Sequence, residues 1–293
     1  MDWNFVDRLD AVLAGAPFLD SIEFDAHGSP DQLAALVRHP SYPEIRGLGV
    51  RALDAAAITH VVETNAFAQL SALDLSIDAR VSAAELAPLM RPHHFAGIER
   101  LEFQPRDDSR AAELLALMPR LRSVSLTFCR DAAAMVSALS RTLVELTIRC
   151  DALDVLARSP LAAGLERLSL RHVTDTNALR ALSEFPRLRS LDLDMERRPA
   201  AKLDAAFAET LLPALRELRC NRLERDTALA IADALGVQLE LFEPTDRFGD
   251  DHDLQSRFAG DFHFTRLVGA GPGFFTRDLP NAPMWDYPRI MLG

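Results

Sequence analysis

One short pattern recurs along most of this 293-residue chain and constrains its fold more than any other feature. The pattern is an apolar residue, two positions of any type, an apolar residue, one free position and a third apolar residue, as in Leu188-Arg-Ser-Leu191-Asp-Leu193. Because neighbouring residues of a strand point to opposite faces, apolar residues two positions apart predict a short, half-buried strand in each copy. Successive copies begin 22 to 28 residues apart, at Leu19, Ile45, Leu70, Ile98, Leu121, Leu143, Leu165, Leu188 and Leu215, and an incomplete tenth copy covers Val237–Phe242.

The segments between the copies each predict one short amphipathic helix. They are rich in Ala and Leu, and many begin with Asp or Ser, whose side chains accept hydrogen bonds from the free N–H groups of a first helical turn. Proline stands two residues before five of the copies, where it ends the helix and extends the chain. Examples of the expected helices are residues 3–16, 31–38, 54–67, 82–90, 109–118, 131–140, 175–185, 204–212 and 226–235.

A repeat of this length with an L-x-x-L-x-L core resembles the leucine-rich repeat family, with the irregular repeats of its bacterial members. The resemblance covers residues 1–242 and implies an α/β fold of nine to ten repeats. In that fold the chain is a right-handed solenoid, or horseshoe, with a parallel β-sheet on the concave face and helices on the convex face. The family usually places Asn or Cys three positions after the last apolar residue, and only Cys129 fits this rule, so we expect less regular turns.

Charge and composition limit the classes of function. A net charge of −11 argues against general nucleic-acid binding, which needs clustered positive charge to displace counterions from phosphates. No apolar run approaches the ~20 residues of a membrane helix, and the sequence begins Met1-Asp-Trp-Asn-Phe, without the basic region of a signal peptide. We therefore expect a cytoplasmic monomer that binds neither nucleic acid nor membrane. The preference for Arg, with Lys202 as the sole lysine, is typical of a GC-rich, bacterial genome.

Residues 243–293 change in character and are expected to form an aromatic-rich C-terminal cap or extension. They carry no further copy of the pattern but contain Phe248, Phe258, Phe262, Phe264, Phe274, Phe275, Trp285 and Tyr287. Two interpretations stay open: the rings cover Leu239 and Leu241 of the last copy, or they dock a partner. The nearby cluster Asp246, Asp250, Asp251, His252 and Asp253 is interpreted as a solvated acidic loop because it lacks EF-hand spacing.

Motifs for catalysis, cofactor binding or metal binding are missing. The sequence has no Gly-x-Ser-x-Gly, His-Glu-x-x-His, Walker or zinc pattern. Cys129, Cys150 and Cys220 lie on or near strands without a C-x-x-C pair, which favours buried free thiols. His93 and His94 are interpreted as part of a solvated loop. We therefore expect no catalytic residue, no cofactor and no metal site.

The positions between the apolar residues of each strand form an outward surface with organised charge. On the sixth to ninth strands, Arg149, Arg167 and Arg171 predict a basic patch beside an acidic patch of Asp192 and Asp194, with Arg219 following. One interpretation is a solvated face in which Glu145 pairs with Arg167 and Arg171 pairs with Asp194. The other is a docking surface that orients a polar or acidic partner segment. In the earlier copies the outward positions include Asp74, Ser123 and Ser125, which we also expect to face solvent.

These observations favour a non-enzymatic scaffold that binds another protein. The partner, whose identity the sequence does not give, would bind through the concave strand face or through the C-terminal aromatic segment. The candidate partner-binding residues are Arg149, Arg167, Arg171, Asp192, Asp194 and Arg219. An alternative is a regulatory inhibitor or immunity-type protein that neutralises an enzyme or toxin, and a hydrolase built on residues 243–293 is the least favoured hypothesis.

Overall fold

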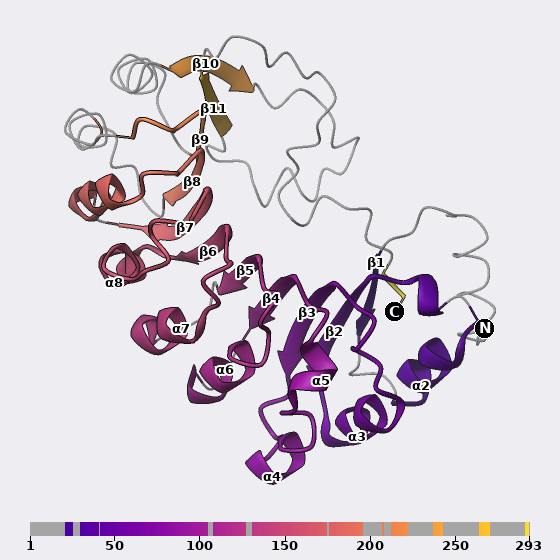
Figure 1. The fold of residues 1–293 in the computed structure, drawn as a ribbon. Helices are drawn as coiled ribbons and strands as arrows, with labels where there is room; N and C mark the ends of the chain where they lie inside the picture. Colours follow the sequence, from indigo (N-terminus) through magenta and orange to yellow (C-terminus); the bar gives the residue numbers. More distant parts are fainter. Residues whose placement is uncertain are drawn as a thin grey trace. The chain divides into compact units, whose positions relative to one another are not determined.

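The computed structural model describes most of the region that carries the repeats and short pieces of the remainder (Figure 1). The described residues are 21–25, 30–40, 42–104, 108–126, 131–174, 176–195, 207, 212–221, 237–242, 264–269 and 291–292. The chain divides into two compact units, which are described separately: unit 1 comprises Met1–Leu143 and Thr276–Gly293, and unit 2 comprises Val144–Phe275. The fold belongs to the α/β class, with mostly parallel strands and intervening helices.

Unit 1 contains a run of parallel strands that follow one another in sequence order. They are β1 (Ser21–Asp25), β2 (Gly47–Leu53), β3 (Ala72–Ile77), β4 (Arg100–Gln104) and β5 (Ser123–Leu126), and β12 (Met291–Leu292) pairs in parallel with the other edge of β1. The α-helices α2 (Pro30–Arg38), α3 (Ala55–Thr64), α6 (Asp108–Leu115) and α7 (Ala132–Ala138) lie on one side of these strands (Figure 1). The short helices η1 (Tyr42–Glu44), α4 (Ala83–Leu86) and α5 (Pro92–Phe95) complete the described elements of this unit.

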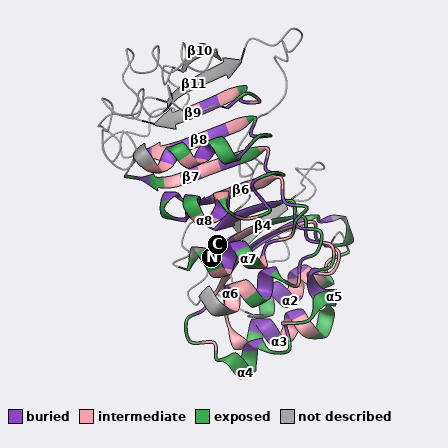
Figure 2. Cartoon of the chain, turned by 60° about the vertical axis from the view of Figure 1, so that its left-hand side comes forward, coloured by how far each residue is buried: buried purple, intermediate pink, exposed green. Residues whose placement is uncertain are grey.

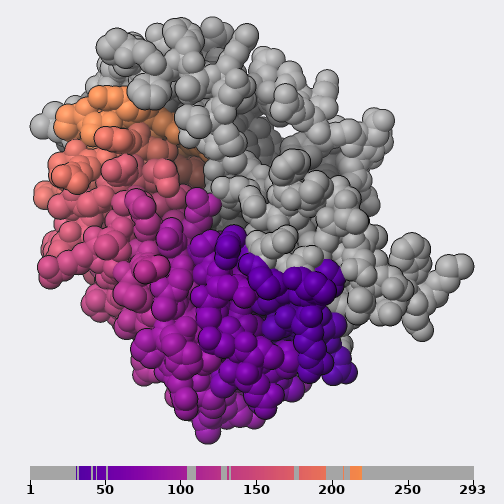
Figure 3. Space-filling model, turned by 45° about the vertical axis from the view of Figure 1, so that its right-hand side comes forward, coloured from indigo at the N-terminus to yellow at the C-terminus, as the bar shows by residue number. Residues whose placement is uncertain are grey.

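The apolar residues of the repeated pattern are in register within unit 1. Leu48 pairs with Leu73, Leu73 with Leu101, and Leu101 with Val124, and all four side chains are buried. In the space-filling view, successive segments of this unit lie as adjacent bands in the order of the sequence (Figure 3). Each copy therefore buries its apolar residues against those of the copies on either side.

Unit 2 repeats the arrangement and then departs from it. The strands β6 (Glu145–Arg149), β7 (Arg167–Val173), β8 (Ser190–Met195) and β9 (Glu217–Asn221) are parallel, with Leu146, Leu168, Leu191 and Leu218 in register. The helices η2 (Cys150–Ala152), α8 (Leu153–Ala157) and η3 (Thr176–Glu184) connect them. Buried and half-buried residues alternate along β6 and β8 (Figure 2), as a strand with one buried face requires.

The incomplete tenth copy forms a strand, but not the next parallel one. The strand β10 (Val237–Phe242) has the predicted bounds, yet its partner is β11 (Phe264–Gly269), which lies antiparallel to both β9 and β10. Residues from the C-terminal stretch thus enter the sheet of unit 2. The boundary placed at residue 242, with a cap or extension after it, stays a prediction, because the aromatic side chains of residues 243–293 lie outside the described part of the chain.

A repeated hydrogen-bond arrangement attaches β3, β4 and β5 in unit 1, and β7, β8 and β9 in unit 2, each to the copy before it. In both units, the carbonyl of the residue after the first apolar position of one copy accepts hydrogen bonds from two consecutive N–H groups of the next copy. For example, Arg46 O accepts from Ser71 N at 2.8 Å and from Ala72 N at 3.0 Å, and Glu166 O accepts from Arg189 N at 2.8 Å and from Ser190 N at 3.1 Å. These shared carbonyls fix where each new strand begins relative to its neighbour.

The predicted helix starts are confirmed at three described positions. The side chain of Asp54 accepts a hydrogen bond from Ala57 N, that of Asp131 accepts from Ala134 N, and Ser82 forms a capping box with Glu85. The predicted helix lengths are less accurate. Residues 82–90 include only the single turn of α4, and Thr176–Glu184 form the 3₁₀ helix η3. The helix expected between the sixth and seventh copies, for which no bounds were predicted, is α8.

Several further predictions lie outside the described residues. They are the helices at 3–16, 204–212 (of which only Phe207 and Leu212 are described) and 226–235, the acidic cluster at 246–253, and the side chains of Cys129 and Cys220. Cys150 is a buried free thiol, as expected. None of the helices in the described ranges has the length and apolar character needed to span a bilayer.

Candidate functional site

The predicted partner-binding residues all lie on four neighbouring strands of unit 2. We call the outward positions of these strands the polar face, because their side chains alternate with the buried Leu and Ile residues of β6, β7, β8 and β9. The structure therefore brings the six predicted residues onto one surface. The polar face comprises Glu145, Thr147, Arg149, Arg167, Ser169, Arg171, Ser190, Asp192, Asp194, Glu217 and Arg219.

Both ion pairs proposed from the sequence are present on this face. Glu145 and Arg167 are register partners on β6 and β7, and Arg167 Nη2 lies 2.8 Å from Glu145 Oε2. Arg171 Nη1 lies 4.0 Å from Asp194 Oδ2, and its Nη2 lies 3.8 Å from Asp192 Oδ2, so this guanidinium bridges the two aspartates at distances longer than a hydrogen bond. The basic and acidic patches are thus interleaved rather than separate.

Asp192 occupies the centre of the polar face. Ser169 Oγ donates a hydrogen bond to Asp192 Oδ2 at 3.3 Å, and Arg219 is the register partner of Asp192 on β9. Desolvation raises the pKa of the Asp192 carboxyl, with a further increase from Asp194, while Arg171, Arg219 and Ser169 act in the opposite direction. The surroundings of Asp192 therefore disfavour its charged form despite the two cations beside it.

Sequence reasoning missed the contacts that hold the other two arginines. Arg219 Nε donates to Glu217 Oε1 at 2.9 Å, and Ser190 Oγ donates to Glu217 Oε2 at 3.3 Å. Arg149 Nη2 lies 3.1 Å from Asp151 Oδ2, in η2 directly after the strand. The sequence did contain a signal for these contacts. Glu217 stands two positions before Arg219, and Asp151 stands two positions after Arg149.

The outward positions of unit 1 differ from the expectation. Asp74, Ser123 and Ser125 are buried, so the prediction that they face solvent was wrong. The register places Arg100 beside Ser123 and Glu102 beside Ser125 on the same side of the sheet. A short side chain next to a longer one on a sheet loses contact with water, which explains why the polar pattern alone was misleading.

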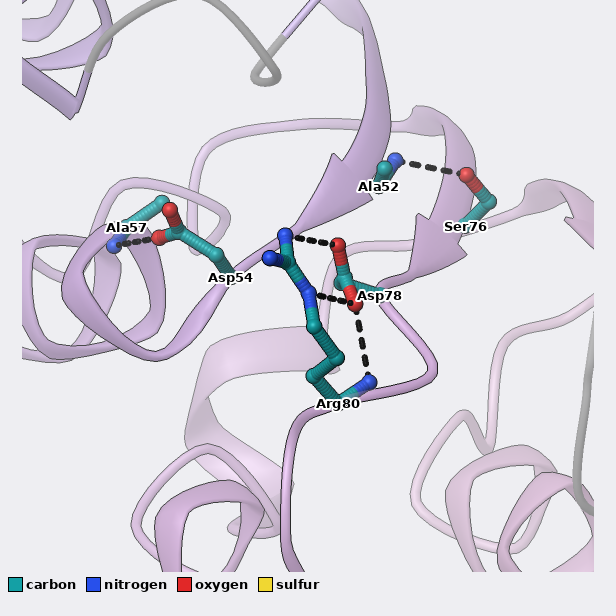
Figure 4. Close-up of polar contacts among 6 residues, drawn as sticks. All are labelled: Ala52, Asp54, Ala57, Ser76, Asp78 and Arg80. Atoms are coloured by element: carbon teal, nitrogen blue, oxygen red, sulfur yellow. Dashed lines mark hydrogen bonds and ion pairs between the residues drawn. The ribbon is translucent and has the colours of Figure 1, made fainter.

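The ends of β2 and β3 form a second polar cluster, which the sequence did not indicate. Asp78 accepts hydrogen bonds from Arg80 N at 2.8 Å, Arg80 Nε at 3.0 Å and Arg80 Nη2 at 2.9 Å, and the guanidinium lies between Asp78 and Asp54 (Figure 4). Ala52 has φ of 51° and donates its N–H to Ser76 Oγ at 2.7 Å. Because Arg80 engages both carboxylate oxygens of Asp78, we interpret this cluster as a structural corner.

His94 lies in the core, so its interpretation as part of a solvated loop was wrong. Its ring is buried within α5, and its Nδ1 lies 2.7 Å from Oδ1 of Asn65, which follows α3. An amide oxygen only accepts, so Nδ1 carries the proton, and the buried Nε2 has no hydrogen-bond partner within the described residues. Desolvation lowers the pKa of His94, and the positive charges of His93 and Arg91 lower it further, while the backbone at Pro88 acts in the opposite direction.

The described residues give no sign of a metal centre, and comparison with known proteins adds no identity. Within the described ranges, no group of three or more His, Cys, Asp or Glu side chains is arranged to hold an ion. Neither the protein-family models nor the curated proteins give a match to this chain. The polar face is therefore the candidate site, on the basis of its own geometry.

Proposed function

We propose that the chain is a leucine-rich-repeat-like solenoid that acts as a non-enzymatic scaffold in the cytoplasm and binds a protein partner through the polar face. In this proposal the parallel strands line the concave surface of a right-handed horseshoe, and the helices form its convex surface. The in-register Leu residues of β2 to β4 and of β6 to β9 support the repeat, because they are the second apolar residue of consecutive copies.

One observation carries the binding proposal. The charged and hydroxyl side chains of the polar face are half-buried or exposed on four neighbouring strands, and several are held in place by one another. Charged groups that are already ordered lose less conformational entropy when a partner binds. A surface of this kind contributes mainly to the specificity and rate of association.

A capture experiment with a charge-reversed face tests this proposal. The tagged full chain and its Arg149→Glu/Arg167→Glu/Arg171→Glu variant are compared as baits in native cell extract. A matched control carries Arg120→Glu, Arg158→Glu and Arg187→Glu, which change the same charge at exposed positions outside the polar face. We expect the unmodified chain and the control to retain the same specific protein and the face variant to lose it. Equal capture by all three baits would move the site away from the polar face.

A regulatory inhibitor or immunity-type protein is the second candidate function. The net charge of −11 supports it, because an acidic protein associates rapidly with a basic enzyme or toxin. In this case the captured protein would be an enzyme or toxin, and the purified chain would abolish its activity at a stoichiometric ratio. Full activity of the captured protein in the complex would leave the scaffold as the better description.

A further inference from the structure

We infer that the polar face recognises an extended acidic segment of its partner, with two carboxylates four residues apart that bind Arg167 and Arg171. This inference rests on the proposed function and specifies the chemistry of the partner. Three observations support it: the exposed fractions of the charged side chains, the N–H groups of two arginines that have no partner within the described residues, and the spacing of these arginines along β7.

The arginines of two ion pairs on the polar face are more exposed than the acids that hold them. The Arg167 side chain is 56% exposed and that of Glu145 is 24% exposed, and the corresponding values for Arg219 and Glu217 are 26% and 14%. Arg149 is less exposed than Asp151, but Asp151 belongs to η2 and not to a strand of the face. The four arginines and four acids of the face balance in formal charge. Arg171 is 33% exposed, level with Asp192 at 31% and Asp194 at 38%, and the most accessible charge of the face is the guanidinium of Arg167.

Arg167 and Arg171 also have donors to offer. Arg167 uses Nη2 for Glu145, and within the described residues its Nε and Nη1 have no hydrogen-bond partner. Arg171 contacts Asp192 and Asp194 only at 3.8 Å and 4.0 Å, beyond hydrogen-bond distance. A guanidinium presents five N–H groups in a planar fork that matches a carboxylate. Each of these arginines can therefore donate hydrogen bonds to one carboxylate of a partner without losing its present contacts.

The two arginines are spaced for an extended chain. Both lie at outward positions of β7, four residues apart, which corresponds to about 13 Å at the rise of a strand. In an extended partner segment, carboxylates at positions i and i+4 also lie on one side and about 13 Å apart. Carboxylates at i+3 or i+5 point to the opposite side, so the spacing of the acids is part of the recognised feature.

A peptide segment fits this face better than a nucleic acid does. The outward positions of β6, β7, β8 and β9 carry no aromatic side chain on which a base could stack. The carboxylates of Asp192, Asp194 and Glu217 lie among the arginines and would repel a continuous phosphate backbone. Two separate carboxylates meet less of this repulsion, because each approaches the face at a single arginine and not along its whole length.

Peptides of fixed composition and variable spacing test the inference. The probes are fluorescein-labelled 14-residue peptides of Gly, Ser and Thr with two Glu residues separated by one to six positions, and one peptide with Gln in place of both Glu. Fluorescence anisotropy with the full chain is measured at low ionic strength. We expect the i, i+4 peptide to bind several-fold more tightly than the i+3 and i+5 peptides, which keep one of the two contacts, and about tenfold more tightly than the Gln peptide, which keeps neither. We expect Arg167→Gln/Arg171→Gln to remove this preference, and the control Arg158→Gln/Arg187→Gln to keep it.

Three outcomes would overturn the inference: equal binding at all Glu spacings, a preference that survives Arg167→Gln/Arg171→Gln, or stronger binding of a labelled oligothymidine than of any peptide. The capture experiment separates this failure from that of the proposed function. If the cellular partner is still lost on reversal of the three arginines, the scaffold function stands and only the acidic segment is wrong. If the partner is retained, the polar face is not the site and both proposals fail.

Discussion

His172 offers the sharpest test of the backbone geometry, because it is an exposed non-glycine residue with φ of 56°. It follows Arg171 at the point where the register between β7 and β8 shifts. The left-handed conformation costs an L-residue ~1–2 kcal/mol because Cβ approaches the following carbonyl oxygen. Glycine avoids this cost but loses ~0.5–1 kcal/mol through its greater freedom in the unfolded chain. His172→Gly should therefore exceed His172→Ala in unfolding free energy by ~0.5–1 kcal/mol.

The comparison of two truncations at one position isolates the backbone contribution, since both remove the same exposed imidazole. Thr174 is the matched control, because it is exposed, lies two residues after His172, and is not among the described residues with positive φ. At Thr174 the order should reverse, with the Gly variant less stable than the Ala variant by ~0.5–1 kcal/mol. Thermal unfolding followed by circular dichroism measures the four variants, and 1 kcal/mol corresponds to a shift of about 2–4 °C. If the Ala variant is the more stable one at both positions, the left-handed geometry of His172 is refuted.

The remaining predictions concern the core, a buried histidine and the centre of the polar face. Leu168→Asp places an unpaired charge at a position that is 2% exposed, so it should lower the free energy of unfolding by several kcal/mol and unfold β6 to β9 together. Thr147→Asp, at an outward position, should not have this effect. Unchanged urea unfolding of the Leu168 variant would contradict the repeat register. His94 has a lowered pKa in the folded chain, so the unfolded chain binds the proton first and stability should fall as the pH drops below ~6.5. His94→Gln should reduce this dependence in urea titrations at pH 7.5 and 5.5, while His172→Gln at an exposed position does not. An unchanged dependence in the first variant would refute the role of His94. Asp192 has a raised pKa, so its ionised form opposes folding above that pKa, and Asp192→Asn should slightly raise the melting temperature at pH 7; a clear decrease would mean that the contacts with Arg171 and Arg219 outweigh desolvation.

The strands were predictable because their signal is local and repeated. Each copy places apolar residues at the first, fourth and sixth positions, and β1 to β10 all fall on these copies. The helix starts at Asp54, Ser82 and Asp131 were predictable for the same reason, since a cap involves residues only three positions apart. The pairs Glu145–Arg167 and Arg171–Asp194 of the polar face followed from the register, which the regular recurrence of the copies determines.

The features that the sequence did not predict depend on contacts between distant residues. The insertion of β11 between β9 and β10 requires an antiparallel partner that carries no copy of the pattern. The burial of His94 depends on Asn65, which is 29 positions away, and on a single helical turn too short to show periodicity. In the same way, the burial of Ser125 depends on the neighbouring strand β4 and not on its own pattern of alternation.

The shared carbonyls at the strand starts separate two properties that usually change together, the length of a segment and the position of the strand after it. Each such strand is aligned by two N–H groups on one oxygen, as at Arg46 and at Glu166, and not by the length of the loop and helix that precede it. Copies of 22 and of 28 residues can therefore occur in one chain with the same register. Insertions and deletions between these anchors should therefore leave the alignment of the neighbouring strands unchanged.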